Sequence, residues 1–211
     1  MKFFSALFRI DLRRYWYCIL LFAAMSVGMP ILMAQKNQPK SDSPFQMLLA
    51  FSVVVCGTLT PFWLIGMDRV RGSMVILWRL PVSRAAIVAS KLAAALLLNT
   101  LALIACGFIV QSTGAISMVE LSRLLEFGLP MLWMISIISV PIYFLVNPQM
   151  APIVAIPCVG LTIAVFLSLD KALLRISIPV AVSVAFLCAI AAALVCVRAT
   201  THVLAVRLDP R

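Results

Sequence analysis

Six long apolar runs, separated by short polar stretches, dominate the chain. Each run holds about 20 residues, the length an α-helix needs to cross the hydrocarbon core of a bilayer. The runs are continuous and do not alternate apolar with polar residues, so the pattern excludes a transmembrane barrel. The predicted spans are residues 15–34, 46–67, 88–111, 127–146, 151–169 and 176–197. We therefore expect an all-α membrane protein in which residues 1–211 form one domain with six transmembrane helices.

Residues 1–14 precede the first span and follow a different pattern. At 100° per residue, one face of a helix over this stretch is basic and polar, and the other is apolar. The first face holds Lys2, Ser5, Arg9 and Arg13. The second holds Phe3, Leu7, Phe8 and Ile10. This pattern predicts an amphipathic helix that lies in the membrane interface. A cleaved signal peptide is the alternative, but the run 15–34 is longer than the 7–15 residues of a signal core.

Asp11 interrupts the apolar side of this N-terminal helix, where it falls with Phe4 and Leu7. A carboxylate that faces lipid is costly. We therefore expect this side to pack on protein, with Asp11 paired to Arg14 or to a basic residue of the 68–84 segment. The alternative is a carboxylate that reaches out to the interface.

The composition supports a membrane protein and excludes several other classes. The chain is 64% hydrophobic and 11% charged, with a mean hydropathy of +1.13, whereas a soluble domain is about 45–50% apolar and about 25% charged. A soluble core could not hide so many apolar side chains. Disorder and a nucleic-acid-binding domain with a solvated basic face are excluded for the same reason.

The net charge of +10 is first a signal of topology. With six spans, twelve basic residues fall on the side that holds both termini, residues 68–91 and the 147–149 turn, and five fall on the opposite side. Basic residues accumulate on the cytoplasmic side of membrane proteins. The charges therefore predict a multi-pass protein of the cytoplasmic (inner) membrane with both termini in the cytoplasm.

The sequence lacks the common catalytic and metal-binding motifs. It has no G-x-x-x-x-G-K-[ST] loop, no H-E-x-x-H helix and no G-x-S-x-G turn, and its one histidine is His202. The six cysteines show no metal-binding spacing. We expect no enzyme and no metal site in this chain. The candidates for a substrate path, or for hydrogen bonds between helices, are the deep polar residues Thr58, Asn99, Thr100 and Thr162.

The connection over residues 68–87 is the most distinctive part of the chain. Its pattern predicts a short helix that ends before Pro81, a sharp turn, and Ser83 as the N-cap of the third span. The short helix carries an apolar ridge between charged ends, formed by Met74, Val75, Leu77 and Trp78. Such a ridge suits a groove on another protein. The alternative is an interfacial loop anchored by Trp78 and the arginines.

Residues 68–91 also resemble the permeases of type-2 ATP-binding-cassette (ABC) exporters. The resemblance is an acidic residue, a Gly-Ser pair, a short apolar helix and a Leu-Pro-Val-Ser-Arg sequence followed by Ile-Val and Ser-Lys. The matching positions are Asp68, Gly72, Ser73, Leu80, Pro81, Val82, Ser83, Arg84, Ile87, Val88, Ser90 and Lys91. The chain departs from the family pattern at Asp68, where Glu is more usual, and at the bulky Trp78-Arg79 pair.

The resemblance implies the transmembrane subunit of an ATP-driven exporter, which forms the substrate path in the lipid bilayer. Its partners would be cytoplasmic ATPase subunits, which bind ATP and Mg, and a second permease subunit, identical or homologous. The implied ATPase contact is formed by Asp68, Arg71, Gly72, Val75, Leu77, Trp78, Arg79, Leu80, Pro81, Val82, Ser83 and Arg84. The uncharged interiors of the spans favour a lipid-like, peptide or hydrophobic drug cargo.

Two other functions are compatible with the sequence. One is an assembly or signalling subunit that binds an ATPase and transports nothing. The other is a membrane-embedded enzyme, which would need ionisable groups at depth that the spans do not contain.

Overall fold

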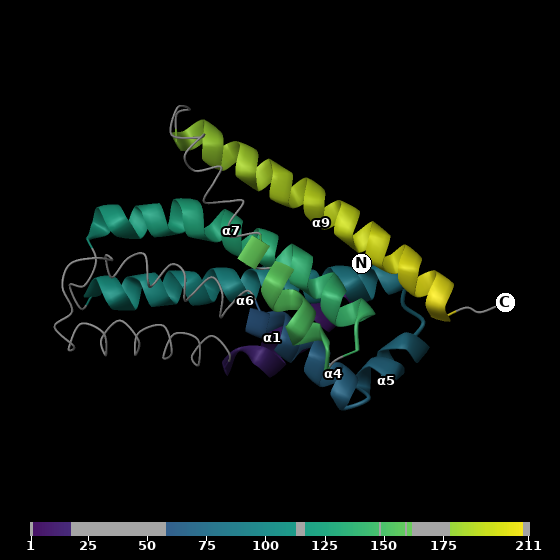
Figure 1. Ribbon diagram of the computed structural model, residues 1–211. Coiled ribbons are helices and arrows are strands. Elements are labelled where there is room, and N and C mark those ends of the chain that lie inside the picture. The colour runs from purple at the N-terminus through teal and green to yellow at the C-terminus, as the bar shows by residue number, and fades with distance from the viewer. Residues whose placement is uncertain are drawn as a thin grey trace.

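The computed structural model of the protein describes residues 2–17, 58–112, 117–147, 149–158, 160–161 and 178–208 (Figure 1). These residues form helices and the turns between them, with no strand in the described ranges. The named elements are α1 (Lys2–Tyr15), η1 (Phe62–Gly66), α4 (Met67–Val70), α5 (Ser73–Arg79), α6 (Arg84–Ser112), α7 (Met118–Leu145) and α9 (Ile178–Leu208). The all-α prediction is confirmed for the described residues.

Among the described residues, three helices are long and apolar enough to cross a membrane: α6, most of α7 and most of α9. They contain the predicted span 88–111, all but the last residue of 127–146 and most of 176–197. The predicted spans 15–34, 46–67 and 151–169 lie partly outside the described residues. Six spans and a cytoplasmic position of both termini therefore stay predictions.

Two of these helices extend beyond their predicted spans. Helix α7 begins at Met118, nine residues before the predicted span 127–146, and continues through Pro130 and Pro141. Helix α9 continues to Leu208, through the basic stretch that follows residue 197. No glycine or proline interrupts either extension, so the helix propagates past the point where hydropathy falls.

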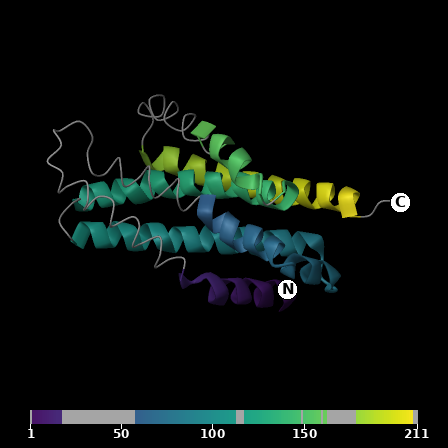
Figure 2. The ribbon, with the colours of Figure 1, turned by 60° about the horizontal axis from the view of Figure 1, so that its bottom comes forward.

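The long helices pack side by side, and α6 lies between α1 and α7 (Figure 2). One end of this bundle holds α4, α5, the start of α6 and the ends of α7 and α9 (Figures 1 and 2). Segments that are far apart in sequence therefore meet at this end.

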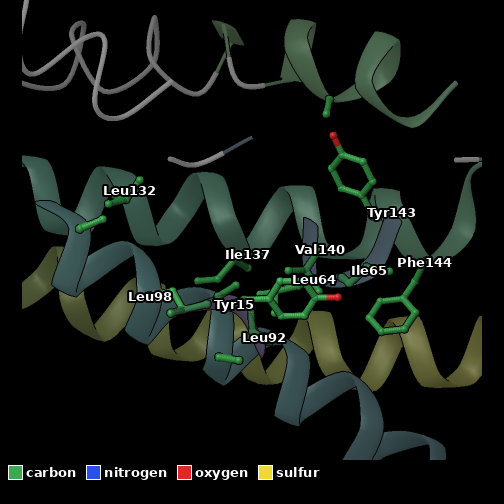
Figure 3. Close-up of a cluster of buried hydrophobic side chains, with 14 of the residues drawn as sticks. Tyr15, Leu64, Ile65, Leu92, Leu98, Leu132, Ile137, Val140, Tyr143 and Phe144 are labelled. Carbon is green, nitrogen blue, oxygen red and sulfur yellow. The ribbon is translucent and has the colours of Figure 1, made fainter. Parts of the chain in front are cut away.

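The core lies between α6, α7 and η1, and Tyr15 of α1 extends it (Figure 3). Among its largest buried side chains are Leu64 and Ile65 of η1, Leu98 of α6 and Leu132 of α7. Fully buried Ala94, Ala95 and Ala102 allow neighbouring helices to approach closely, as small residues do in membrane bundles. By contrast, α9 leaves most of its apolar surface exposed, as expected of a helix that faces lipid or another subunit.

Helix α1 packs against α6 through one face. That face holds Phe8, Asp11, Leu12 and Tyr15, a helical spacing of three and four residues. The expectation that the Asp11 side packs on protein is confirmed, because Asp11 is 4% exposed. Ile10, which the sequence places on the apolar face of the amphipathic helix, is 56% exposed.

The 68–87 connection has the local structure that its sequence predicts. Helix α5 ends at Arg79 with Leu80 in an extended conformation, immediately before Pro81. Helix α6 begins at Arg84, and the backbone N–H of Ala86 donates to Ser83 Oγ at 3.2 Å, so Ser83 is the N-cap. Between α4 and α5, Gly72 has a φ of 73°, a left-handed conformation that favours glycine.

Candidate functional site

Asp68 lies at the centre of a buried ionic cluster that joins four helices. Its Oδ1 atom accepts hydrogen bonds from Arg14 Nη1 at 3.0 Å, Tyr15 Oη at 3.2 Å and Ser73 Oγ at 2.9 Å. Its Oδ2 atom lies 2.6 Å from Lys91 Nζ. The donors come from α1, α5 and α6, while Asp68 belongs to α4. This one carboxylate therefore attaches the α4–α5 connection to two other parts of the fold.

The Lys91 ammonium bridges a second carboxylate. Lys91 Nζ lies 2.6 Å from Asp11 Oδ1, and both side chains are almost inaccessible to solvent. Buried charges are tolerated only where they are paired and hydrogen-bonded. We call the six residues Asp11, Arg14, Tyr15, Asp68, Ser73 and Lys91 the Asp68 cluster.

The two carboxylates of the cluster differ in acidity. Burial raises the pKa of Asp11, and the Lys91 ammonium offsets only part of that effect. Burial also favours the neutral form of Asp68, but Lys91, Ser73 and Arg14 outweigh it and lower the pKa of Asp68. Asp68 is therefore firmly ionised, and Asp11 is the easier of the two to protonate.

The cluster corrects the partner expected for Asp11. The sequence predicts Arg14 or a basic residue of the 68–84 segment, whereas the structure pairs Asp11 with Lys91, which lies two turns from the start of α6. Arg14 pairs with Asp68 instead. One signal could have indicated this pairing: Lys91 lies two turns inside an apolar run, where a cation needs a carboxylate, and the chain has only seven acidic residues.

Arg69 attaches α4 to a third helix. Its Nη1 atom donates to the carbonyl oxygens of Tyr143 at 2.9 Å and Phe144 at 3.4 Å, and also to that of Val146. These carbonyls lie at the C-terminal end of α7, where they lack partners within the helix and where a positive charge is favoured. Sequence reasoning missed this role of Arg69.

Helix α5 presents different residues to the protein and to the outside. Met74 is buried, Leu77 and Trp78 are half-buried against the core, and the Trp78 ring packs edge-on against Phe144 at 6.3 Å. The outer face carries Val75, Ile76 and Leu80, which are 55%, 65% and 42% exposed. Ile76 is the most exposed apolar side chain of α5 and was absent from the set expected from sequence.

The other residues expected at the ATPase contact surround this face. Arg71, Arg79, Pro81 and Ser83 are exposed, whereas Gly72, Val82 and Arg84 are half-buried. Asp68 is buried in the Asp68 cluster, so its carboxylate contacts other residues of this chain and is not exposed to a partner. The structure thus separates the residues expected at the ATPase contact into exposed residues, which a partner could reach, and buried or half-buried residues, which pack against the rest of the protein.

The deep polar residues form hydrogen bonds between helices. Asn99 of α6 is fully buried; its Oδ1 accepts from Thr60 Oγ1 at 2.5 Å, and its Nδ2 donates to Ser136 Oγ of α7 at 2.7 Å. Thr100 Oγ1 accepts a hydrogen bond from Trp133 Nε1 at 3.0 Å. These bonds support the interhelical role of Asn99 and Thr100. Thr58 is helical and half-buried, and Thr162 lies outside the described residues.

Within the described ranges, no group of three or more His, Cys, Asp or Glu side chains is placed to hold a metal ion. Cys188 and Cys196 of α9 are in the thiol form.

A family model described as "ABC-2 family transporter protein" matches residues 6–203. The match begins in α1 and ends in α9, so it includes the Asp68 cluster and the whole of α5. No curated protein and no solved structure matches the chain significantly.

Proposed function

The chain belongs to the ABC-2 family of transporters, and we propose from this premise that it is the transmembrane subunit of an ATP-driven exporter. As a family member with apolar spanning helices, it is a multi-pass membrane component of a transporter. In the proposed assembly, two permease subunits, identical or homologous, form the substrate path and bind cytoplasmic ATPase subunits. ATP and Mg are bound by those partners, since this sequence contains no phosphate-binding loop.

The outer face of α5 is the observation that carries this proposal. Val75, Ile76 and Leu80 form an exposed apolar strip beside the exposed Arg71 and Arg79. Protein interfaces combine an apolar centre with a polar rim, and charges at the rim orient the partner. A cytoplasmic ATPase with an apolar groove and acidic edges fits this face.

The attachment of α5 to the fold supports a role in transmitting force. Asp68 links the segment to α1 and α6, Arg69 links it to α7, and Trp78 packs on Phe144 of α7. A push on α5 would therefore move three helices as a unit. Closure of the ATPase subunits on ATP would bias the spans between two states through these contacts.

The position of α5 supports the orientation predicted from charge. Helix α5 lies at the end of the bundle where α6 begins and where α7 and α9 end (Figure 2). In the proposal this end faces the cytoplasm, together with both termini and the ATPase subunits.

Copurification with the ATPase tests the proposal. The permease is coexpressed with a candidate ABC ATPase subunit from the same genome, and complexes are isolated from membranes through a tag on the permease. Ile76→Glu places a charge at the centre of the outer face and should reduce ATPase recovery at least tenfold, the effect of about 1.4 kcal/mol. Met118→Glu is the matched control: Met118 is 62% exposed, like Ile76, but begins α7 at the opposite end of the bundle.

Equal ATPase recovery with both variants would overturn the proposed contact. If the ATPase binds through α5 but its hydrolysis is identical in detergent and in liposomes loaded with hydrophobic dyes and peptides, the assembly or signalling function is favoured over export.

A further inference from the structure

A half-open groove of about 320 Å³ lies between α5 and the ends of α7 and α9. Its lining is apolar except for one guanidinium. The lining residues are Arg69, Met74, Val75, Trp78, Phe144, Leu145 and Leu204. A groove of this character fits a molecule that has a long apolar part and one negative group.

Arg69 is the charged group of the groove, and it differs from the cations of the Asp68 cluster. Arg14 and Lys91 each pair with a carboxylate, whereas in the described part of the chain Arg69 bonds only to backbone carbonyls, and through Nη1 alone. The other guanidinium N–H groups have no protein acceptor among the described residues. A half-buried cation without an anionic partner favours the binding of an anion.

The groove lies beside the C-terminal end of α7, a helix that is long and apolar enough to span the membrane. Leu145 is the last residue of α7, and the half-buried Trp78 forms part of the wall. Tryptophan is enriched at the level of lipid headgroups. A phospholipid in the adjacent leaflet has its phosphate at this level and its acyl chains toward the apolar layer.

We propose that this groove binds an anionic phospholipid of the bilayer, with its phosphate on Arg69 and an acyl chain against Met74, Trp78 and Leu204. The bound lipid holds α5 against α7 and α9, because the groove walls come from all three helices. A zwitterionic lipid binds more weakly, since its choline carries a positive charge near the same guanidinium. This site shares Val75 with the proposed ATPase contact, but its test needs no ATPase.

Lipid binding to the purified full-length chain tests the proposal. Native mass spectrometry measures the retention of phosphatidylglycerol and of phosphatidylcholine with the same acyl chains, and thermal unfolding in detergent measures the stabilisation that each gives. We expect phosphatidylglycerol to bind about tenfold more tightly, because both lipids offer a phosphate to Arg69 but only phosphatidylcholine brings a second positive charge near it. Glycerol 1-phosphate, the headgroup without chains, should give no stabilisation.

Two variants locate the site. Arg69→Gln removes the cation and should abolish the preference for phosphatidylglycerol. Leu204→Trp should fill the groove while Arg69 keeps its hydrogen bonds, and it should also abolish the preference for phosphatidylglycerol. This variant tests the site if Arg69→Gln fails to fold. Leu194→Trp is the control, because Leu194 is 69% exposed on the same helix and does not line the groove.

Three results would overturn the proposal. The first is equal binding of the two lipids by the unaltered chain, and the second is an unchanged preference for phosphatidylglycerol in Leu204→Trp. The third is stabilisation by glycerol 1-phosphate equal to that by phosphatidylglycerol, which would mean that the groove contributes nothing to binding.

Discussion

Lys91 Nζ lies 2.6 Å from Asp68 Oδ2 and 2.6 Å from Asp11 Oδ1, so a single ammonium connects α6 to α4 and to α1. The contact fixes where the α4–α5 connection lies on the bundle. The same contact attaches α1 to α4 and α6, although α1 carries the exposed residues Arg9 and Arg13, which are typical of a surface helix. Changes to this contact should therefore affect both the stability of the fold and the motion of α5.

Removal of Lys91 should destabilise the protein strongly. Lys91→Met leaves two carboxylates buried without their shared cation, and the loss of one partner of a buried ion pair costs on the order of 3–5 kcal/mol. Reversible unfolding in mixed micelles measures the free energy of unfolding. Arg79→Met is the control, because Arg79 is exposed and forms no ion pair in the described part of the chain. A similar small effect of both substitutions would show that the cluster contributes little to stability.

The two carboxylates of the cluster should affect stability with opposite dependences on pH. Burial raises the pKa of Asp11 above its usual 3.8, so the folded state binds this proton more tightly than the unfolded state does. The stability contributed by protonated Asp11 is lost as the pH rises from 3.8 through the raised pKa. The pKa of Asp68 is lowered, so its contribution is present above pH 3.8 and is lost as the pH falls through the lowered value.

Melting temperatures across the acid range measure this difference. The advantage of the unaltered protein over Asp11→Asn should shrink as the pH rises above 3.8. Its advantage over Asp68→Asn should shrink as the pH falls below 3.8. If the melting temperatures of the two variants changed in parallel with pH, the raised pKa of Asp11 and the lowered pKa of Asp68 would be contradicted.

Gly72 should be required for its backbone conformation alone. Its φ is 73°, and no atom lies within 4 Å of an added Cβ. Gly72→Ala therefore introduces left-handed strain without a steric clash, at a cost of roughly 1–2 kcal/mol. Gly160→Ala is the matched control, because its added Cβ also meets open space but its φ is not positive. In a helix this change should be neutral or slightly stabilising. Equal stability of the two variants would exclude strain at the α4–α5 turn.

Cysteine labelling tests the orientation of the bundle. In a background without native cysteines, Ser83→Cys at the start of α6 and Met118→Cys at the start of α7 place exposed thiols at opposite ends. An impermeant maleimide added to intact cells should label Met118→Cys and leave Ser83→Cys unlabelled until the cells are broken. The reverse pattern would contradict the orientation predicted from charge.

Local features of the α5–α6 connection could be predicted from sequence, because they depend on neighbouring residues. Pro81 predicts the end of α5, and Ser83 predicts the start of α6, and both occur there. The length of the continuous apolar runs likewise predicts the long helices α6, α7 and α9, because a helix needs about 20 apolar residues to cross a bilayer.

Long-range contacts could not be predicted in the same way. Asp11 and Lys91 are 80 residues apart, and their pairing depends on how α1 packs on α6. Periodicity shows which residues share a face of a helix, but not which face a neighbour covers. For this reason Trp78, expected to contact a partner, packs on Phe144, while Ile76, absent from that expectation, is exposed.

The contrast between Ile76 and Trp78 separates binding of the ATPase from stability of α5. Trp78→Ala removes a half-buried ring from Phe144 and should lower the free energy of unfolding by roughly 1–2 kcal/mol. Ile76→Ala should leave stability unchanged, because the side chain is 65% exposed, but should weaken ATPase binding about tenfold or more if that face is buried in the complex. Thermal unfolding and copurification of each variant measure the two effects. If Trp78→Ala weakens ATPase binding without loss of stability, whereas Ile76→Ala changes neither, the inner edge of α5 is the contact and the segment must turn outward to bind.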